Sequence, residues 1–352
     1  MKVALITPAN LWFCPFVKIY SVALDSLSVN YDIITWCRDG KPEDNCIEFI
    51  SKRKGKLGKA LSYVDFIRFV KKTVKENKYD RLVVFTSQLA ILLLPFLRSK
   101  FRGRYIADYR DLSVEQKSYL MPLYKKVLSN SFANFVSSPG FIKCLPEGID
   151  YLMSHNFVVA NVREAMQTTA TLPIAKDGEI CVLTIGGIRD YSSNIEVVKA
   201  LANKEKIKLL FVGKGAASAR IEAYCKENDI HNVEFYGYYP KEEEPNYIKK
   251  ATFLNIYYPR VITHDTALSN RFYNSLIYKR PMIVTSNTTQ GDYAKDNNLG
   301  LSLDDCTGLD VKLKTWLSEC ANQSYVNRCD DLLRKFLEDY EVFFSRLKEF
   351  VK

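Results

Sequence analysis

Five short apolar runs between residues 180 and 285 constrain the fold of this chain more than any other feature. ICVLTI at 180–185 leads into Gly186-Gly187, and KLLFV at 208–212 leads into Gly213-Lys214-Gly215. The other runs are at 233–236, 252–257 and 281–285. Continuous apolar runs of this length are typical of strands buried on both faces of a parallel sheet. Glycines after such strands let a phosphate approach the backbone and the next helix, so the pattern predicts a nucleotide-binding domain.

The first half of the chain also alternates between strand and helix patterns, which is typical of a doubly wound sheet. Expected strands are at 2–7, 32–36, 81–86, 104–107, 135–137 and 158–160, expected helices at 16–27, 60–77, 88–97 and 113–129, and an expected loop at 39–58. Polar residues and Pro173 predict an interdomain linker at 163–179. A helical tail is expected at 325–350.

The predicted fold class is therefore α/β, with two Rossmann-like doubly wound domains facing a central cleft. The expected domains are an N-terminal one at 1–165 and a C-terminal one at 178–336. The last helix, about 337–352, is a candidate to pack back on the N-terminal domain. A chain of 352 residues is long enough for two domains of this size.

The net positive charge of the chain comes entirely from its first half. Residues 1–170 carry 25 Lys and Arg against 15 Asp and Glu, whereas residues 171–352 carry 25 of each. Two interpretations stay open with equal weight: an ordinary solvated surface, or contact with an anionic membrane face or a lipid-linked acceptor. Nucleic acid is not expected as a partner, because no recognition motif for it occurs.

The cellular compartment is predicted from what the sequence lacks. The N-terminus begins directly with a short strand pattern rather than a signal peptide, and no apolar segment approaches the roughly 20 residues that span a bilayer. The nine cysteines show no C-x-x-C pair and no zinc-like spacing. We therefore expect a cytoplasmic protein with reduced thiols, either free or peripheral on the inner face of the membrane.

Landmarks in both halves resemble the glycosyltransferases of the two-Rossmann (GT-B) fold, closest to the retaining family 4 type of bacterial polysaccharide biosynthesis. In the second half they are LTIGGIRDYSSNIEVVKAL (183–201), LLFVGKG (209–215), VEFYGYYPKEE (233–243), YIKKATFLNIYY (247–258) and SNRFYNSLIYKRPMIVTS (269–286). In the first half they are ADYRDLS (107–113), SSPGFIKCLP (137–146) and HNF (155–157). Their order and spacing, rather than any single motif, make the resemblance.

This resemblance implies a hexosyl- or related transferase that moves a sugar from a nucleotide donor, such as a UDP- or GDP-sugar, to a glycan or polyprenyl-diphosphate-linked acceptor. The donor is expected on the second domain and the acceptor on the first. No metal or other cofactor is implied, so cations of the protein must balance the leaving diphosphate.

The donor-site residues implied by the resemblance lie after the apolar runs. Arg189 and Arg271 match the family's basic residues and are predicted as catalytic residues, because their guanidinium groups can bind a diphosphate and stabilise its developing charge. Further donor-site candidates are Gly186, Gly187, Lys214, Gly215, His264, Asp265, Thr266, Asn270 and Asn274. Simpler interpretations stay open: turn glycines, an exposed arginine, backbone geometry at Lys214 and a merely polar surface at His264 and Asp265.

The sequence departs from the family at two positions. Thr266 and Asn274 stand where many members carry glutamates, the second of which normally accepts hydrogen bonds from the ribose hydroxyls. Asn274 can still hydrogen-bond a ribose, but without the assistance of a charge. A catalytically degenerate relative that binds a nucleotide sugar or acts as a scaffold at the membrane is therefore the alternative function.

Two acids of the first half, Asp108 and Asp111, resemble the family's acidic cluster on the acceptor side. Carboxylates there could orient an acceptor hydroxyl or take its proton, and both are predicted as catalytic residues. Asp111 could equally cap a helix that starts near Leu112. A nicotinamide dehydrogenase is disfavoured because no G-x-G-x-x-G follows the first strand, and a nucleotide-sugar epimerase because acids are lost at 266 and 274.

Overall fold

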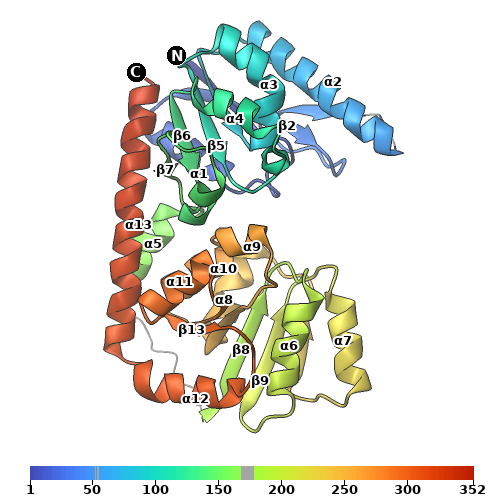
Figure 1. The fold of residues 1–352 in the computed structure, drawn as a ribbon, viewed down its shortest axis with the longest axis vertical. Helices are drawn as coiled ribbons and strands as arrows, with labels where there is room; N and C mark the ends of the chain where they lie inside the picture. The colour runs from blue at the N-terminus through green and yellow to red at the C-terminus, as the bar shows by residue number, and fades with distance from the viewer. Residues whose placement is uncertain (52, 54, 168–177) are drawn as a thin grey trace. The chain divides into compact units, whose positions relative to one another are not determined.

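The structure, a computed structural model, describes residues 1–51, 53, 55–167 and 178–352 and consists of two compact units. The first contains Met1–Asn156 and Glu338–Lys352, and the second contains Phe157–Leu337. Each unit is built on one parallel sheet flanked by helices (Figure 1). Within the described residues, no helix combines the length and the hydrophobicity that a membrane crossing requires.

The first unit holds a seven-stranded parallel sheet of order β3-β2-β1-β4-β5-β6-β7. Its strands are β1 (Lys2–Ile6), β2 (Asn30–Cys37), β3 (Cys46–Ile50), β4 (Arg81–Phe85), β5 (Tyr105–Tyr109), β6 (Ala133–Val136) and β7 (Leu152–Met153). Its helices and turns are α1 (Val17–Ser26), α2 (Gly55–Glu76), α3 (Ser87–Lys100), η1 (Val114–Gln116), α4 (Met121–Leu128) and η2 (Pro139–Cys144). The order of strands reverses between β1 and β4, which makes the sheet doubly wound.

The second unit holds a six-stranded parallel sheet of order β10-β9-β8-β11-β12-β13. Its strands are β8 (Ile180–Ile185), β9 (Ile207–Val212), β10 (Val233–Tyr236), β11 (Phe253–Ile256), β12 (Met282–Thr285) and β13 (Gly300–Leu303). Its helices and turns are α5 (Val159–Gln167), α6 (Tyr191–Leu201), α7 (Ser218–Glu227), η4 (Lys241–Glu243), α8 (Glu244–Lys250), α9 (Ile262–Thr266), α10 (Asn270–Ile277), α11 (Thr289–Asp296) and α12 (Leu309–Cys320). Here the order of strands reverses between β8 and β11.

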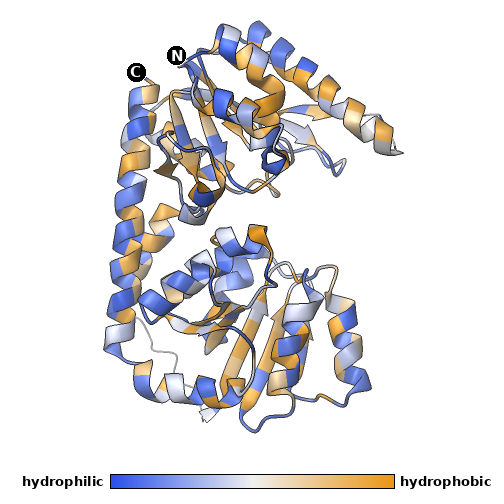
Figure 2. Ribbon diagram, viewed as in Figure 1, coloured by the Kyte–Doolittle hydropathy of each residue, from blue (hydrophilic) through white to orange (hydrophobic). Residues whose placement is uncertain are grey.

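Each sheet forms the centre of its own hydrophobic core, and Figure 2 shows hydrophobic residues along the strands. The predicted α/β class with two Rossmann-like, doubly wound domains is confirmed. The last helix, α13 (Gln323–Phe350), has residues in both units because the division falls after Leu337. Its apolar residues Phe343, Leu347 and Phe350, spaced for one helical face, pack in the first core.

Several expected elements differ from the structure. The expected loop at 39–58 contains β3, whose residues pair with β2 from Ile33↔Cys46 onward, and also the start of α2. The expected helix at 113–129 is a short turn, η1, followed by α4, because Glu115 accepts a hydrogen bond from the amide of Ser113 and fixes the turn. Residues 158–160 belong to or adjoin α5 rather than a strand.

The expected linker at 163–179 is only partly described. Residues 163–167 belong to α5, which contacts α10 in the second unit, so they are helical rather than linker-like. Residues 168–177 lie outside the described residues. The N-terminal segment of the first unit ends at Asn156, nine residues before the boundary expected at 165, because α5 packs in the second unit.

Candidate functional site

A pocket of about 580 Å³ opens at the carboxyl end of the second sheet. Its lining includes Ile185 and Gly186, where β8 ends, and Tyr258, two residues beyond the end of β11. These are the two strands between which the strand order reverses. In open α/β sheets, ligands bind outside the carboxyl ends of strands at such a switch point. The position of the pocket therefore favours a ligand site.

The glycines after β8 and β9 let two loops approach closely at one side of this pocket. Gly213 has φ +121°, and a Cβ there would lie 2.1 Å from the carbonyl oxygen of Gly186. A Cβ on Gly215 would lie 2.1 Å from the carbonyl oxygen of Ile188. Gly215 does not line the pocket, so its contribution is backbone packing against the first loop. The loop of Gly186 and Gly187 lines the pocket directly.

Arg271 is the central cation of the pocket, and α10 carries it. Its side chain is buried and donates from Nε to the carbonyl oxygen of Ile185 at 2.5 Å, from one terminal nitrogen to that of Asn255 at 3.2 Å and from the other to that of Gly187 at 3.2 Å. A guanidinium has five N–H donors, so two remain beyond these three bonds. Arg271 therefore holds the strand ends together and also presents positive charge to the pocket.

The N-terminus of α10 lies at the same pocket. Ser269 caps the helix by accepting a hydrogen bond from the amide of Phe272, and Gln290 in turn accepts from the hydroxyl of Ser269 at 2.7 Å. Ser269, Asn270 and Arg271 all line the pocket. A helix N-terminus attracts anions through its unsatisfied N–H groups and its dipole. The predicted residue Asn270 thus lies where an anion would meet this helix.

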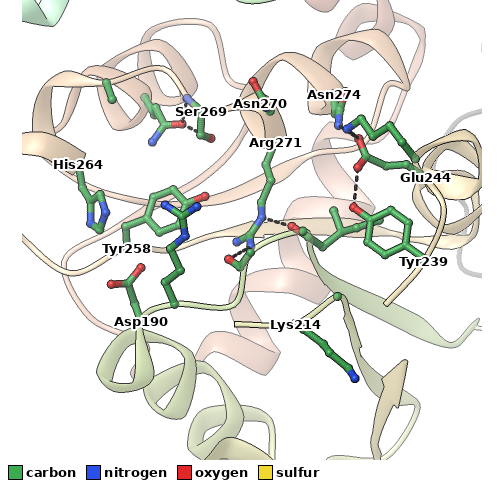
Figure 3. Close-up of a pocket in the computed structure, with 18 of the residues that line it drawn as sticks. Asp190, Lys214, Tyr239, Glu244, Tyr258, His264, Ser269, Asn270, Arg271 and Asn274 are labelled. Carbon is green, nitrogen blue, oxygen red and sulfur yellow. Dashed lines mark hydrogen bonds and ion pairs between the residues drawn. The ribbon is translucent and has the colours of Figure 1, made fainter. Parts of the chain in front are cut away.

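Four cationic side chains line the pocket: Arg189, Lys214, Lys241 and Arg271. Arg189 and Lys214 are exposed, and Figure 3 shows Lys214 at the edge of the group. Gly237 leaves room for the alkyl chain of Lys214, whose Cε lies 3.1 Å from the position of a Cβ there. Two carboxylates, Asp190 and Glu244, oppose these charges. The balance of charge is positive, as a diphosphate ligand requires.

The predicted loop residues near 264–266 separate in the structure. His264 lines the pocket and its ring lies 5.0 Å from that of Tyr258. Asp265 does not line the pocket, because its carboxylate accepts from Arg260 at 2.9 and 3.2 Å. Thr266 also lies outside the lining and donates to the carbonyl oxygen of Ile262 at 2.7 Å. A direct donor contact from the side chain of Asp265 or Thr266 thus has no support in this geometry.

Asp108 is a buried, ion-paired residue of the first unit. Its side chain is completely buried, forms a two-point ion pair with Arg110 and accepts a hydrogen bond from Tyr20 of α1. Arg110 also donates to the carbonyl oxygen of Ser154 at 2.9 Å. A carboxylate without exposed atoms cannot contact an acceptor, so this geometry does not support a catalytic role for Asp108.

Asp111 follows β5 and is exposed. It does not cap a helix near Leu112, because the next helical element is the short turn η1, whose N-cap is Ser113. Both acids lie in the first unit, whereas the pocket described above is lined only by residues of the second. The expected cleft between the domains, and a role for Asp111 in it, remain predictions.

Sequence reasoning missed three charged residues of the pocket, Asp190, Lys241 and Glu244, of which Glu244 is the buried one. Glu244 begins α8 and is buried, and Figure 3 shows it beside Asn274 and Tyr239. Its carboxylate accepts hydrogen bonds from Asn274 at 3.0 Å and from Tyr239 at 2.6 Å. Burial, followed by this bond to Glu244, raises the pKa of Tyr239 above its ordinary value, so the phenol stays a donor. The only available signal was the acidic run 242–244, which is typical of an exposed surface.

No protein-family model matches this sequence, and no curated protein matches it. Solved structures do match over nearly the whole chain. Anabaena Alr3699/HepE, determined in complex with UDP and glucose, has a TM-score of 0.69 at 10% identity and covers 99% of this chain and 100% of its own. WaaG, a glycosyltransferase involved in lipopolysaccharide biosynthesis, has a TM-score of 0.60 at 13% identity and covers 96% and 95%.

A third match comes from a protein that is named as a phosphatase. The N-terminal domain of trehalose-6-phosphate phosphatase from Candida albicans has a TM-score of 0.70 at 13% identity and covers 100% of this chain and 99% of its own. The chain therefore has the GT-B fold that its sequence landmarks predicted. Because one fold hosts many functions, the activity must be argued from the pocket itself.

Proposed function

We propose that the protein is a glycosyltransferase that takes a sugar from a nucleoside diphosphate donor held in the pocket of the second unit. The observation that carries this proposal is the convergence of Arg189, Lys214, Arg271 and the N-terminus of α10 at the switch point of one sheet. Fixed cations and helix amides are the groups that bind a diphosphate and stabilise the charge that develops on it as it leaves.

The proposed mechanism asks the protein to position and to neutralise rather than to react covalently. The bond between the anomeric carbon and the diphosphate oxygen breaks, and the electron pair of that bond stays on the departing diphosphate. Arg189 and Arg271 stabilise the new charge, and an acceptor hydroxyl attacks the oxocarbenium-like carbon and passes its proton to an oxygen of the departing diphosphate. Retention of anomeric configuration and independence from metal ions are parts of the proposal that rest on the family resemblance.

The proposed acceptor is a glycan or a polyprenyl-diphosphate-linked glycan of bacterial surface polysaccharide synthesis, and the proposed location is the inner face of the cytoplasmic membrane. The structural likeness to WaaG supports this choice. A further support is one face of α2, on which Leu57, Leu61 and Val64 are exposed at helical spacing. We call these three residues the α2 apolar stripe. The first half of the chain also carries the whole excess of positive charge, and apolar side chains together with basic residues suit an anionic lipid surface.

The second candidate function is a degenerate relative that binds a nucleotide sugar without turning it over. The replacement of the family glutamates by Thr266 and Asn274 favours it. Of these two positions, only Asn274 lines the pocket. Both candidates predict nucleotide binding, and only the first predicts turnover.

The experiment uses the purified full chain with UDP and GDP in a thermal-shift assay, followed by a panel of UDP- and GDP-sugars analysed for nucleoside diphosphate release. Glycosyl transfer or slow donor hydrolysis supports the enzyme. Tight binding of a nucleoside diphosphate without release from any donor supports the degenerate relative. Absence of binding by both UDP and GDP contradicts both candidates.

A further inference from the structure

Glu244 is the buried one of two carboxylates in a pocket whose balance of charge is positive. Its side chain is 10% exposed and accepts from donors on three different segments. Tyr239, from the loop after β10, donates to Oε2 at 2.6 Å. Lys241 of η4 donates to Oε1 at 2.5 Å, and Asn274 of α10 donates to the same oxygen at 3.0 Å. Burying a carboxylate normally costs free energy, and these three hydrogen bonds offset that cost.

These hydrogen bonds do not occupy all the acceptor positions of the carboxylate. Two carboxylate oxygens offer about four acceptor positions, and the three bonds occupy two on Oε1 and one on Oε2. The second position on Oε2 remains for a donor from the pocket. Because a carboxylate accepts hydrogen bonds and repels phosphate oxygens, its ligand partner must be a hydrogen-bond donor, such as a hydroxyl.

The position of Glu244 indicates which hydroxyl this is. Figure 3 shows Asn274, Glu244 and Tyr239 on one side of Arg271, with Tyr258 and His264 on the other. Arg271 and the start of α10 mark the diphosphate, so Glu244 lies to one side of it. The lining also contains Tyr238, which is 84% exposed and precedes Tyr239 in the chain. An aromatic surface beside a hydroxyl acceptor suits a nucleoside, with its flat base and its ribose diol.

The partner of Glu244 on α10 fits this assignment. Asn274 must present its amide nitrogen to Glu244, because a carboxylate cannot donate. A glutamate at 274 would put a second carboxylate near the first, and the two like charges would repel. The amide at 274 and the carboxylate at 244 therefore form one unit, in which the negative charge comes from α8 rather than from α10.

We infer that Glu244, oriented by Asn274 and Tyr239, recognises the ribose diol of the donor and makes the pocket specific for ribonucleotides over deoxyribonucleotides. This inference rests on the proposed function, because it needs a nucleoside diphosphate in the pocket. It assigns the negative charge that binds the ribose hydroxyls to Glu244 of α8, which lies outside the sequence landmark 269–286 that contains Asn274.

The test compares the binding of UDP, 2′-deoxy-UDP and 3′-deoxy-UDP to the full chain by calorimetry. The wild-type protein is expected to bind UDP at least about tenfold more tightly than at least one deoxy analogue, since a hydrogen bond to a charged group contributes about 1.5–3 kcal/mol. Glu244→Gln is expected to lower that preference to about twofold or less, while its affinity for the deoxy analogue stays within about threefold of the wild-type value.

Two further variants make the test specific. Glu242→Gln changes an exposed acid two residues earlier that does not line the pocket, and it should leave the preference unchanged. The double variant Glu244→Gln/Asn274→Glu exchanges the amide and the carboxylate, and it should restore at least part of the preference lost in Glu244→Gln. A purely structural role for Glu244 would weaken UDP and its deoxy analogues equally.

The outcomes separate this inference from the function on which it rests. Loss of the ribose preference in Glu244→Gln, with recovery in the exchanged variant, supports it. Binding of UDP without any ribose preference, or with a preference that survives in Glu244→Gln, overturns it and leaves the nucleotide site intact. If neither UDP nor GDP binds to the wild-type protein, the proposed function fails and the inference fails with it.

Discussion

The Nε atom of Arg271 donates a hydrogen bond to the backbone oxygen of Ile185 across a sequence separation of 86 residues. Ile185 is the last residue of β8, and Arg271 lies in the first turn of α10. Since the same guanidinium also binds the carbonyl oxygens of Asn255 and Gly187, one side chain fixes the ends of two strands and the glycine loop. The geometry of the pocket and its charge therefore depend on the same residue.

Replacement of Arg271 should reduce both stability and activity. Arg271→Ala leaves three carbonyl oxygens without their donor in a buried place, which is expected to lower the free energy of unfolding by about 3 kcal/mol. We expect kcat/KM, or nucleotide affinity, to fall at least about tenfold. Arg271→Lys keeps the charge but not the planar fork, so it should lose stability and recover only part of the activity. Denaturant unfolding and donor turnover measure the two effects. Wild-type stability in Arg271→Ala would show that Arg271 does not hold the strand ends together.

Replacement of Arg189 should reduce binding without reducing stability. Arg189 is exposed and lines the pocket, so Arg189→Ala removes charge from the ligand site and leaves the core unchanged. We expect nucleotide affinity or turnover to fall at least about tenfold, equivalent to about 1.4 kcal/mol, with the melting temperature preserved. Arg334→Ala, an exposed arginine of α13 outside the pocket lining, is the control and should behave as wild type. Equal nucleotide affinity in Arg189→Ala and Arg334→Ala would refute the assignment of Arg189.

Two glycines near the pocket should respond differently to alanine. A Cβ on Gly215 would meet the backbone of Ile188 at 2.1 Å, so Gly215→Ala must move one of the two loops and should lower both the melting temperature and nucleotide affinity. The three atoms nearest to a Cβ on Gly187 all belong to the side chain of Arg189, the first of them at 3.3 Å. Gly187→Ala should therefore keep the melting temperature and weaken the nucleotide by displacing Arg189. Thermal unfolding with and without UDP distinguishes the variants. A Gly215→Ala variant with the wild-type melting temperature would contradict the close packing of Gly215 against the backbone of Ile188.

Strands buried on both faces could be predicted from the sequence, because burial leaves a continuous apolar run. The runs at 180–185 and 281–285 correspond closely to β8 and β12. The edge strand β3 was missed, since its sequence CIEFI follows a polar segment and its pairing with β2 is a tertiary feature. Residues 158–160 form a short apolar run, which predicts a strand. In the structure they lie at the start of α5, a helix that packs on α10.

The candidate site was only partly predictable, because a residue type at a strand end does not show where its side chain is buried. Arg189 and Arg271 could be located by their positions after β8 and at the start of α10, and both line the pocket. The burial of Asp108 depends on Tyr20, which is 88 residues away in the sequence. Glu244 resembles its exposed neighbours in the sequence, and its partner Asn274 comes from another helix 30 residues away.

The first unit should become less stable in mild acid because of His155. Burial is the main cause that holds the pKa of His155 below its ordinary value, although the hydrogen bond with Asp339 opposes this shift. The unfolded chain therefore binds the proton more readily, and the free energy of unfolding should fall as pH drops below about 6.5, by at most about 1.4 kcal/mol per pH unit. His155→Gln should remove this part of the pH dependence. Denaturant unfolding between neutral and mildly acidic pH measures it, and parallel curves for the two proteins would contradict it.

The α2 apolar stripe provides the last prediction, which concerns binding to anionic membranes. Leu57, Leu61 and Val64 are 76%, 42% and 45% exposed, so they contribute little to the core and are available to a lipid surface. We expect the full chain to bind vesicles of phosphatidylglycerol, and to bind less at high salt and on vesicles of neutral phosphatidylcholine, because the basic first half supplies the attraction. Changing all three residues to serine should greatly reduce binding while stability is kept, since each apolar side chain transferred from water contributes up to about 1.5–3 kcal/mol.

The control for this prediction is Val311→Ser, which removes an exposed apolar side chain of α12 in the second unit. It should leave vesicle binding unchanged, because the second half of the chain carries no excess of positive charge to bring that surface to the lipid. Vesicle co-sedimentation at several salt concentrations measures all variants. Binding that is independent of salt, or equal in the serine variant and the wild type, would show that the basic residues serve only solubility and that the stripe does not dock on lipid.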